Sequence, residues 1–355
     1  MIITRPTKQH TLAEPTDILT GRGLYTGDEV MVCIGPAAPN SGINFVYAEA
    51  SGPGYWLKAQ PTGFKVRAHY QSVDDKASVG YTLLTNELGH TVQTPEHFLS
   101  GLAGMGIDNA NIYFVRSSGS GTDFSFELPL LDGGCKEVVN AIQKAGIVQQ
   151  DADREFIRII RPVRVADSNN RYVELAPNDS GTFTVDCTIR VPGVEEDGKL
   201  GTVERRAKFD LADRDVFMRY VAPARTLTTL TLAEKLKERM PDVSGTPDNV
   251  LIICDKTSDP ANYGKPHKSG YKNDRVDEPA WHKGLDVVGD TEGLNNQRII
   301  GSYTSVNGGH QMNNMLMREV YRLGEGVAYE RIVGSPSLVP DAKPSKPLVD
   351  ASLPY

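Results

Sequence analysis

Between residue 16 and about residue 92, short apolar runs alternate with Gly, Pro and Asn. Three of these runs are EVMVCIGPA, INFVYAEA and GYTLLTN. Apolar runs of this length, bounded by turn-forming residues, are typical of antiparallel strands joined by turns. We therefore expect a sheet near the N-terminus.

The period of the pattern changes in TPEHFLSGLAGMGIDN, at residues 94–109. Apolar side chains recur there at helical spacing, namely Phe98, Leu99, Leu102 and Met105. Thr94 stands at the position of an N-cap, and Pro95 stands at the favoured first helical position. The pattern predicts a helix that begins at Glu96 or one residue earlier.

Three further elements complete the first half. They are a strand, ANIYFV, a Gly/Ser-rich loop, RSSGSGTD (116–123), and a helix, DGGCKEVVNAIQKAGI, which we expect to stop near Gly146.

The second half repeats the order of the first. Its expected strands are FIRIIRPVRVA, RYVELAP and TFTVDCTIRV; the helix EPAWHKGLDVVGD, the strand RIIGSYTSV, a glycine pair and the helix HQMNNMLMREVYRLG follow. Two halves with one order of elements predict an α+β fold of two similar domains, each a sheet layered with helices.

We place the first domain at residues 1–150 and the second at residues 151–335, with the polar segment IVQQDADR (147–154) as the bridge. The second domain carries an insertion at about residues 224–276, which holds a helix, a strand and a Lys/Gly/Asn-rich loop. Such insertions often shape a binding site. The last twenty residues, 336–355, hold five prolines without a helical or strand period, which predicts an extended tail.

Composition narrows the classes of function. The chain has 355 residues and a formal net charge of -7, and it lacks a long basic run, so a nucleic-acid-binding surface is not expected. It also lacks a signal-peptide core and the roughly 18 consecutive apolar residues of a membrane span, so we expect a cytoplasmic protein without a membrane span. Four scattered cysteines without a C-x-x-C pair predict reduced, mostly buried thiols: Cys33, Cys135, Cys187 and Cys254.

One expected helix places a histidine and a carboxylate one turn apart. His282 and Asp286 share a face of EPAWHKGLDVVGD and are close enough to hold one metal ion, although an ordinary surface pair is the commoner meaning of this spacing. Glu96 and His97 open another helix, where the free N–H groups favour a carboxylate. Three such ligands leave a fourth position for water, and Glu96 would act as its base. Without those partners, Glu96 would only stabilise its helix.

A third histidine follows two glycines in NGGHQMNN. His310 opens the final expected helix, and Asp290 could hold it protonated as a general acid. Standing alone, His310 would more often be a capping or core histidine. The sequence contains no G-x-S-x-G elbow, no G-x-x-x-x-G-K-[ST] loop, no G-x-G-x-x-G after a strand and no H-E-x-x-H, which argues against those chemistries.

Six segments together resemble a known family. TGRGLYTG, TPEHFLSGLAGMGIDN, LPLLDGG, ARTL, HKGLDVVGD and GGHQMNN occur in the order of the UDP-3-O-acyl-N-acetylglucosamine deacetylases, the zinc amidohydrolases of lipid A synthesis. The resemblance runs from about residue 18 to 325. It implies two similar α+β domains packed together with the metal site between them.

The resemblance also implies a role for each matching residue. The zinc ligands would be His97, His282 and Asp286, with ferrous iron as the other metal to consider. Glu96 would be the base, and His310, supported by Asp290, would be the acid that protonates the leaving amine.

The expected substrate contacts follow in the same way. Thr226 would donate its hydroxyl to the oxyanion, with Leu227 beside it at the substrate, and Lys283 would lie near the phosphates. Among the positions that depart from the better known members, two lie where the nucleotide would bind. Cys187 stands where they carry an aromatic residue that stacks on uracil, and Asn307 stands where they carry a lysine near the diphosphate.

The expected function is therefore zinc-dependent removal of acetate from UDP-3-O-acyl-N-acetylglucosamine, by a monomer whose partner is this small-molecule substrate. The two departures leave open a divergent paralogue that acts on a different, non-UDP, N-acyl amino sugar. A third hypothesis is a non-catalytic binding protein stabilised by zinc. Glu96 and His310 argue against it, because a structural metal site needs neither.

Overall fold

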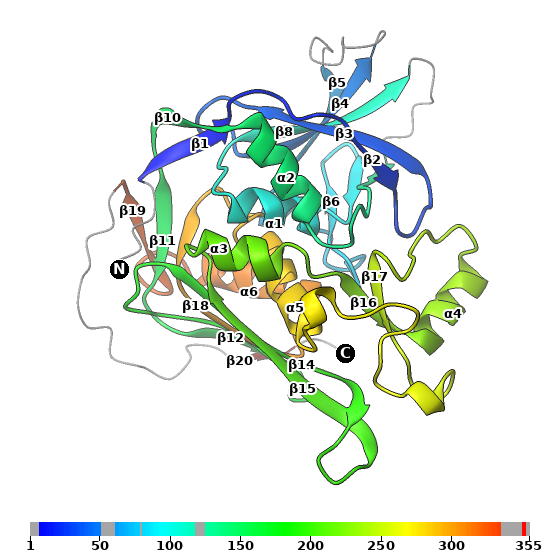
Figure 1. Cartoon of the computed structure of the whole chain (residues 1–355). Coiled ribbons are helices and arrows are strands. Elements are labelled where there is room, and N and C mark those ends of the chain that lie inside the picture. The colour runs from blue at the N-terminus through cyan, green and yellow to red at the C-terminus, as the bar shows by residue number, and fades with distance from the viewer. Residues whose placement is uncertain (1–6, 51–60, 79, 118–124, 335–349, 353–355) are drawn as a thin grey trace.

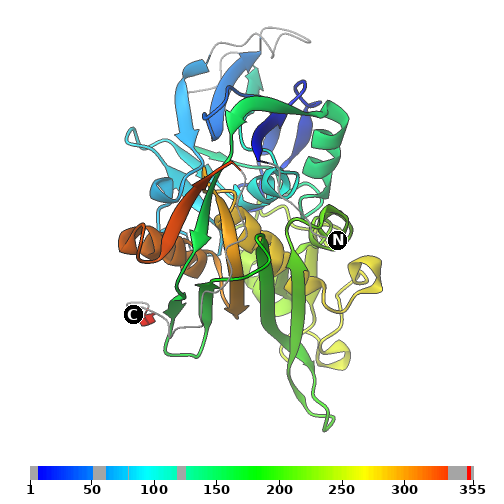
Figure 2. The same cartoon turned by 90° about the vertical axis from the view of Figure 1, so that its left-hand side faces the viewer.

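The computed structural model describes residues 7–50, 61–78, 80–117, 125–334 and 350–352. Each half of the chain forms a sheet, and helices from both halves lie between the two sheets (Figures 1 and 2). The expected α+β fold of two similar domains is thus confirmed. The residues at which one domain ends and the next begins stay a prediction.

The sheet of the first half has five strands in the order β2-β3-β8-β4-β5. Their bounds are β2 Leu19–Arg22, β3 Glu29–Pro36, β4 Ile43–Ala50, β5 Pro61–Arg67 and β8 Ala110–Ser117. A smaller sheet beside it has the order β6-β7-β9, with β6 Leu83–Thr85, β7 Thr91–Gln93 and β9 Ser125–Glu127. Strand β7 leads directly into the first helix, so this small sheet sets where that helix begins.

The sheet of the second half follows the path β15-β14-β18-β13-β12-β20, and β11 pairs with both β18 and β19. Its strands are β11 Glu155–Ile159, β12 Val163–Ala166, β13 Tyr172–Ala176, β14 Phe183–Val194, β15 Leu200–Asp210, β18 Arg298–Val306, β19 Tyr329–Val333 and β20 Asp350–Ser352. Strands β14 and β15 form a long hairpin that extends beyond the rest of the molecule (Figure 2).

The helices form where the sequence places apolar residues at helical spacing. Their bounds are α1 Glu96–Gly104, α2 Lys136–Ala145, α3 Arg214–Val216, α4 Leu230–Arg239, α5 Glu278–Asp290 and α6 His310–Leu323. A π-helical turn, Phe217–Val221, continues α3, and single 3-10 turns lie at Tyr70–Ser72, Pro260–Asn262 and Lys272–Asp274. Helix α2 stops at Gly146, whose φ of 76° lies in the left-handed region that favours glycine. The expected stop near Gly146 is confirmed.

The start of α1 is as expected, but its cap is not. The helix begins at Glu96, and Pro95 occupies the cap position without a side-chain hydrogen bond. Thr94 has a φ of 54°, and its hydroxyl donates to the carbonyl oxygen of Gln93 instead of accepting from the helix. The prediction of Thr94 as N-cap was therefore wrong, because its hydroxyl is hydrogen-bonded to the last residue of strand β7.

Three expectations about connecting segments also change. The segment 147–154, expected as a polar bridge, mostly forms strand β10 (Ile147–Asp153), which pairs with β1 (Lys8–Leu12). The expected loop 116–123 begins within β8, and its residues 118–123 lie outside the described residues. In the tail, β20 pairs in parallel with β12, so a strand forms where none was expected, while residues 336–349 and 353–355 lie outside the described residues.

The insertion contains one strand more than expected. Strand β16 (Thr226–Thr229) pairs in parallel with β17 (Val250–Ile253), and α4 connects them.

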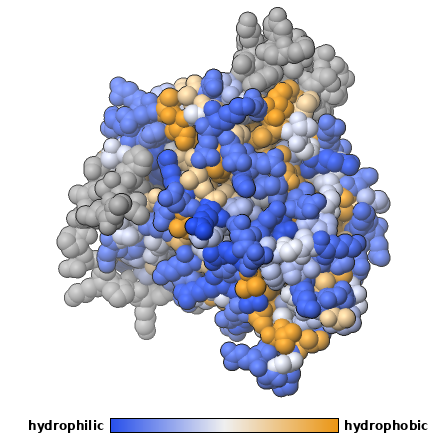
Figure 3. Space-filling model, in the orientation of Figure 1, coloured by the Kyte–Doolittle hydropathy of each residue, from blue (hydrophilic) through white to orange (hydrophobic). Residues whose placement is uncertain are grey.

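The face of the molecule in Figure 3 is largely hydrophilic, with apolar groups exposed over the β14–β15 hairpin, where Val194 and Leu200 lie. None of the helices in the described part of the chain has the length and apolar character to cross a membrane.

Candidate active site and metal centre

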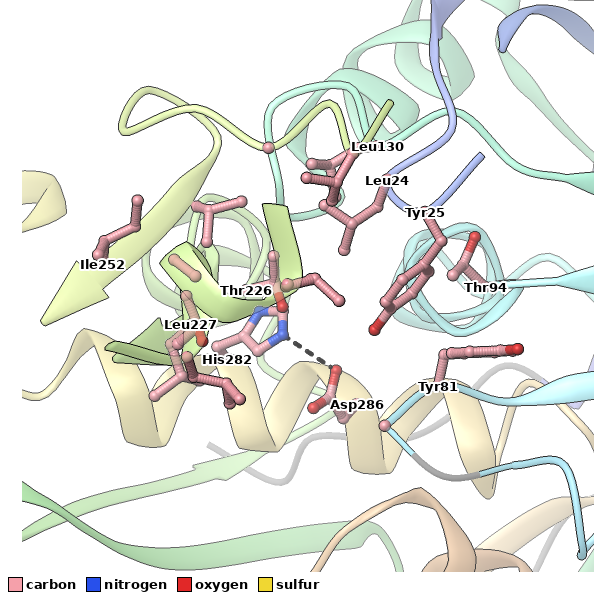
Figure 4. A pocket seen from close by; sticks show the side chains of 18 of the residues that line it. Leu24, Tyr25, Tyr81, Thr94, Leu130, Thr226, Leu227, Ile252, His282 and Asp286 are labelled. Carbon is pink, nitrogen blue, oxygen red and sulfur yellow. Dashed lines mark ion pairs between the residues drawn. The ribbon is translucent and has the colours of Figure 1, made fainter. Parts of the chain in front are cut away.

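Two helices from different halves of the chain meet at the centre of the molecule. Helix α1 begins with Glu96 and His97, and helix α5 carries His282 and Asp286 one turn apart. The helices approach closely at Gly289, where a Cβ atom would clash with the backbone of Glu96. Figure 4 shows His282 and Asp286 side by side on α5, at the wall of a cavity.

Three side chains from these helices converge as a candidate set of metal ligands. The donor atoms of His97, His282 and Asp286 all lie within 4.8 Å of one another. Oδ1 of Asp286 is 3.2 Å from Nε2 of His282 and 3.8 Å from Nε2 of His97. Two imidazole nitrogens and a carboxylate oxygen are the donors that zinc takes in catalytic sites.

The hydrogen bonds around these ligands also fit a cation. Nδ1 of His282 donates to the carbonyl oxygen of Ala224 at 2.9 Å, so Nε2 of the neutral ring has no proton and can only accept. Oδ1 of Asp286 is buried and has no hydrogen-bond donor within the described residues. Two acceptors therefore face each other, and a shared cation would satisfy both. The residues present fit a bound metal ion.

The protonation states agree with this interpretation. Burial lowers the pKa of His97 to about 3, so its ring is neutral near pH 7. Burial alone would raise the pKa of Asp286, but His282 and Lys283 hold it well below its usual range. Nζ of Lys283 donates to Oδ2 of Asp286 at 2.7 Å. Neutral imidazoles and an ionised carboxylate are the forms that bind metals.

A second histidine–carboxylate pair lies beside the candidate ligands. Nδ1 of His310, at the start of α6, donates to Oδ2 of Asp290 at 2.8 Å, and Nε2 of His310 lies 3.8 Å from Asp286. Burial lowers the pKa of His310, but the carboxylates of Asp290, Asp286 and Glu96 together raise it to about 9. The cation is therefore the favoured form of His310 near pH 7.

The carboxyl group of Glu96 completes this arrangement. Its side chain is buried, and Oε2 accepts from the backbone N–H of Thr82 at 3.3 Å. Burial, partly opposed by the charge of His310, raises the pKa of Glu96 to about 8. Glu96 can act as a base only in its ionised form. Positive charge close to the carboxyl group, such as a metal ion at the neighbouring ligands would bring, favours that form.

Comparison with known proteins identifies the family. Residues 9–322 match the sequence model of UDP-3-O-acyl N-acetylglycosamine deacetylase, LpxC. The chain belongs to this family. Because its curated relatives are named deacetylases, the protein is a hydrolytic enzyme, and its family is one of metalloenzymes.

Curated relatives span nearly the whole chain. A UDP-3-O-acyl-N-acetylglucosamine deacetylase of Methylococcus capsulatus is 31% identical over 303 residues, which are 85% of this chain and 86% of the relative. The enzyme of the same name from Legionella pneumophila strain Philadelphia 1 is 32% identical over 304 residues, which are 85% of this chain and 86% of the relative. The one from Vibrio vulnificus strain YJ016 is 30% identical over 332 residues, which are 93% of this chain and 96% of the relative.

In this LpxC-family chain, the candidate ligands and His310 line a cavity of about 750 Å³. Three of the expected substrate contacts line it, namely Thr226, Leu227 and Lys283. Figure 4 shows Thr226 next to His282, and Tyr25 and Tyr81 on the opposite wall. The rings of these two tyrosines are 4.9 Å apart.

Two expected contacts lie elsewhere in the structure. Cys187, on β14, is fully buried in the hydrophobic core and does not line the cavity, so its burial does not support a role at the substrate. Asn307 accepts a hydrogen bond from the backbone N–H of Arg190 through Oδ1 at 2.8 Å. Gly309, two residues further along, does line the cavity.

Sequence reasoning missed the residues that support the candidate catalytic groups. Oγ1 of Thr82 and Nδ2 of Asn313 both donate to Asp290, at 2.7 and 2.8 Å. The carbonyl oxygen of Ala224 orients His282. Asn313 follows His310 by three residues and so lies on the same helical face, a signal that was present in the sequence. Thr82 and Ala224 carried no such signal, because their contacts join distant parts of the chain.

Proposed function

We propose that the protein removes acetate from the N-acetyl group of UDP-3-O-acyl-N-acetylglucosamine, a step of lipid A biosynthesis. One observation supports this most strongly. A candidate set of metal ligands, a buried carboxyl group and a buried histidine converge at one wall of a large cavity. A metal site that only stabilised the fold would need neither Glu96 nor His310, and would more often be closed by a fourth protein ligand.

The proposed ligands of the metal are His97, His282 and Asp286, and the proposed ion is zinc, with ferrous iron as the other metal to test. When bound, the ion supplies a Lewis acid for the amide carbonyl and lowers the pKa of a water molecule. The hydrogen bond from His282 to Ala224 fixes the ring so that Nε2 faces the shared centre.

The remaining groups transfer protons and stabilise the negative charge of the transition state. Glu96 takes a proton from the attacking water onto its carboxylate. His310 donates its Nε2 proton to the leaving amine, and Asp290 holds the ring through Nδ1. Thr226 lines the cavity near His282, where its hydroxyl can donate to the oxygen that becomes negative in the transition state.

The cavity also suits an acylated substrate. An apolar part of its wall is formed by Leu230, Leu236, Val250 and Ile252 of the insertion together with Leu24 and Leu130 of the first half. An alkyl chain buried there gains about 0.8 kcal/mol for each CH₂ group. Lys283 adds a cationic group at the polar wall, where a phosphate could bind.

A second substrate is favoured by one observation. Cys187 is buried, and Asn307 is already hydrogen-bonded to Arg190, so neither offers the stacking ring or the cation that a uridine diphosphate would use. An acylated N-acetyl amino sugar without a nucleotide is therefore the alternative substrate.

Three substrates separate these possibilities. Acetate release by the metal-loaded protein would be measured with UDP-3-O-acyl-N-acetylglucosamine, with UDP-N-acetylglucosamine and with an acylated N-acetylglucosamine 1-phosphate. The proposal predicts efficient turnover only of the first. Equal kcat/KM for the first and third would assign the enzyme to the alternative substrate class. Equal kcat/KM for the first and second would refute the role of the apolar wall.

A further inference from the structure

A second group of metal-binding side chains lies in the insertion. Cys254 directly follows strand β17, and Asp259 and His267 lie in the loop after it. Their donor atoms all lie within 4.8 Å of one another. Sγ of Cys254 is 3.7 Å from Oδ2 of Asp259 and 4.0 Å from Nδ1 of His267. This group shares no residue with the ligand set of α1 and α5.

The separations match the size of a tetrahedral zinc site. Zinc binds sulfur at about 2.3 Å and nitrogen or oxygen at about 2.0–2.2 Å, which places tetrahedral ligand atoms about 3.5 Å apart. The two distances from Sγ of Cys254, 3.7 and 4.0 Å, exceed this value by only a few tenths of an ångström. Small side-chain rotations would bring all three atoms into coordination.

The backbone holds these ligands in place. Strand β17 and the returning loop are joined by hydrogen bonds from the N–H of Cys254 to Lys265, from Gly264 to Cys254, and from His267 to Ile252, at 2.7–2.9 Å. The carboxylate of Asp259 accepts from the backbone and side chain of Asn262. A ligand set fixed in this way binds a cation with little loss of conformational entropy.

The neighbouring carboxylate does not belong to this group. Asp255 accepts hydrogen bonds from the backbone and hydroxyl of Thr231 and from the backbone N–H groups of Thr257 and Ser258. These bonds are those of a carboxylate that organises a turn. The three side chains of the cluster therefore leave a fourth coordination position for water.

We propose that Cys254, Asp259 and His267 bind a second divalent transition-metal ion, with zinc as the expected metal. On binding, a metal–sulfur bond replaces the S–H bond of Cys254, and the proton leaves to solvent. The aspartate oxygen and the histidine Nδ1 each donate a lone pair, and no group is oxidised or reduced.

The site would fix a loop that borders the active-site cavity. His267 and Lys268 line the cavity, and the hydroxyl of Tyr263 donates to the carbonyl oxygen of Gly201 on the β14–β15 hairpin. The metal would therefore join β17 to a loop that already contacts both the cavity and the hairpin.

Cobalt substitution tests this site separately from the catalytic one. The protein would be freed of metal with a chelator and reloaded with Co²⁺, and bound cobalt and the near-ultraviolet spectrum would be measured. A thiolate–cobalt charge-transfer band requires a cysteine ligand, and the set on α1 and α5 has only nitrogen and oxygen donors. We expect two cobalt ions for each chain and such a band.

Variants assign the band to its residues. Cys254→Ser should remove the band and one cobalt ion, whereas Cys33→Ser, at a buried cysteine of β3, should keep both. Asp286→Ala should remove the other ion and leave the band. If Cys254→Ser does not fold, His267→Ala, which removes a half-buried ring, provides the same test. One cobalt ion without the band in the unaltered protein, or a band that survives Cys254→Ser, would overturn the proposal.

Discussion

At the scale of single residues, Thr226 is the proposed catalytic group whose role rests on position alone. Its hydroxyl carries no charge, and it lines the cavity beside His282. Thr226→Val keeps the shape but removes the donor, so we expect kcat to fall by a factor of about 10²–10³ with KM little changed. Thr228→Val, at another threonine that lines the cavity, is the matched control. Steady-state kinetics measures both, and equal losses in the two variants would contradict this role.

Asp290 illustrates how a buried charge depends on its partners. It is fully buried and accepts from His310, Asn313 and Thr82. Asp290→Ala would leave the His310 cation buried without its partner, so we expect the free energy of unfolding to fall by about 3–5 kcal/mol. Denaturant unfolding of the metal-loaded protein measures this. A loss below about 1 kcal/mol would mean that the pair contributes little to the fold.

The candidate ligands were predictable from sequence because each pair lies within one helix. His282 and Asp286 are one turn apart, and Glu96 and His97 are adjacent. That the two pairs meet was a hypothesis from residue types that the family resemblance strengthened, since local spacing does not tell which helices pack together. For Cys187, neither the local sequence pattern nor the family resemblance revealed that the side chain is buried in the core.

At the scale of elements, the site depends on how closely α1 and α5 approach. A Cβ atom at Gly289 would overlap the backbone of Glu96. Gly289→Ala must therefore push the helices apart, and we expect a loss of about 1–3 kcal/mol in stability together with reduced turnover. Gly270→Ala, where a Cβ atom would meet nothing within 4 Å, is the control. Thermal unfolding and acetate release measure the two effects, and a fully active, fully stable Gly289→Ala would show that the helices can move without consequence.

Elements with a strong pattern were predicted best. Helix α5 has the expected bounds because its apolar positions have helical spacing and Pro279 stands in its first turn. Strands β10 and β15 were missed, because their outward side chains are polar along much of their length and few of their residues are buried. Such strands form because a neighbouring strand offers backbone partners, which a local pattern does not reveal.

At the scale of the whole molecule, the two halves share one hydrophobic core. Phe98 on α1, Leu285 on α5 and Leu316 on α6 all belong to it, as do residues of both sheets. The repeated order of elements predicted two similar domains, and this is the arrangement found. The candidate active site lies between helices of the two halves, so neither half alone would hold the complete set of groups.

The central claim is that this shared site hydrolyses an amide with Glu96 as its base. The most direct test is acetate release from UDP-3-O-acyl-N-acetylglucosamine by the metal-loaded protein and by Glu96→Gln, with bound metal measured in both. Glutamine keeps the shape of the side chain but cannot take up the proton. We predict equal metal content and turnover at least about 100-fold lower in the variant. Equal turnover in the two proteins would contradict the account.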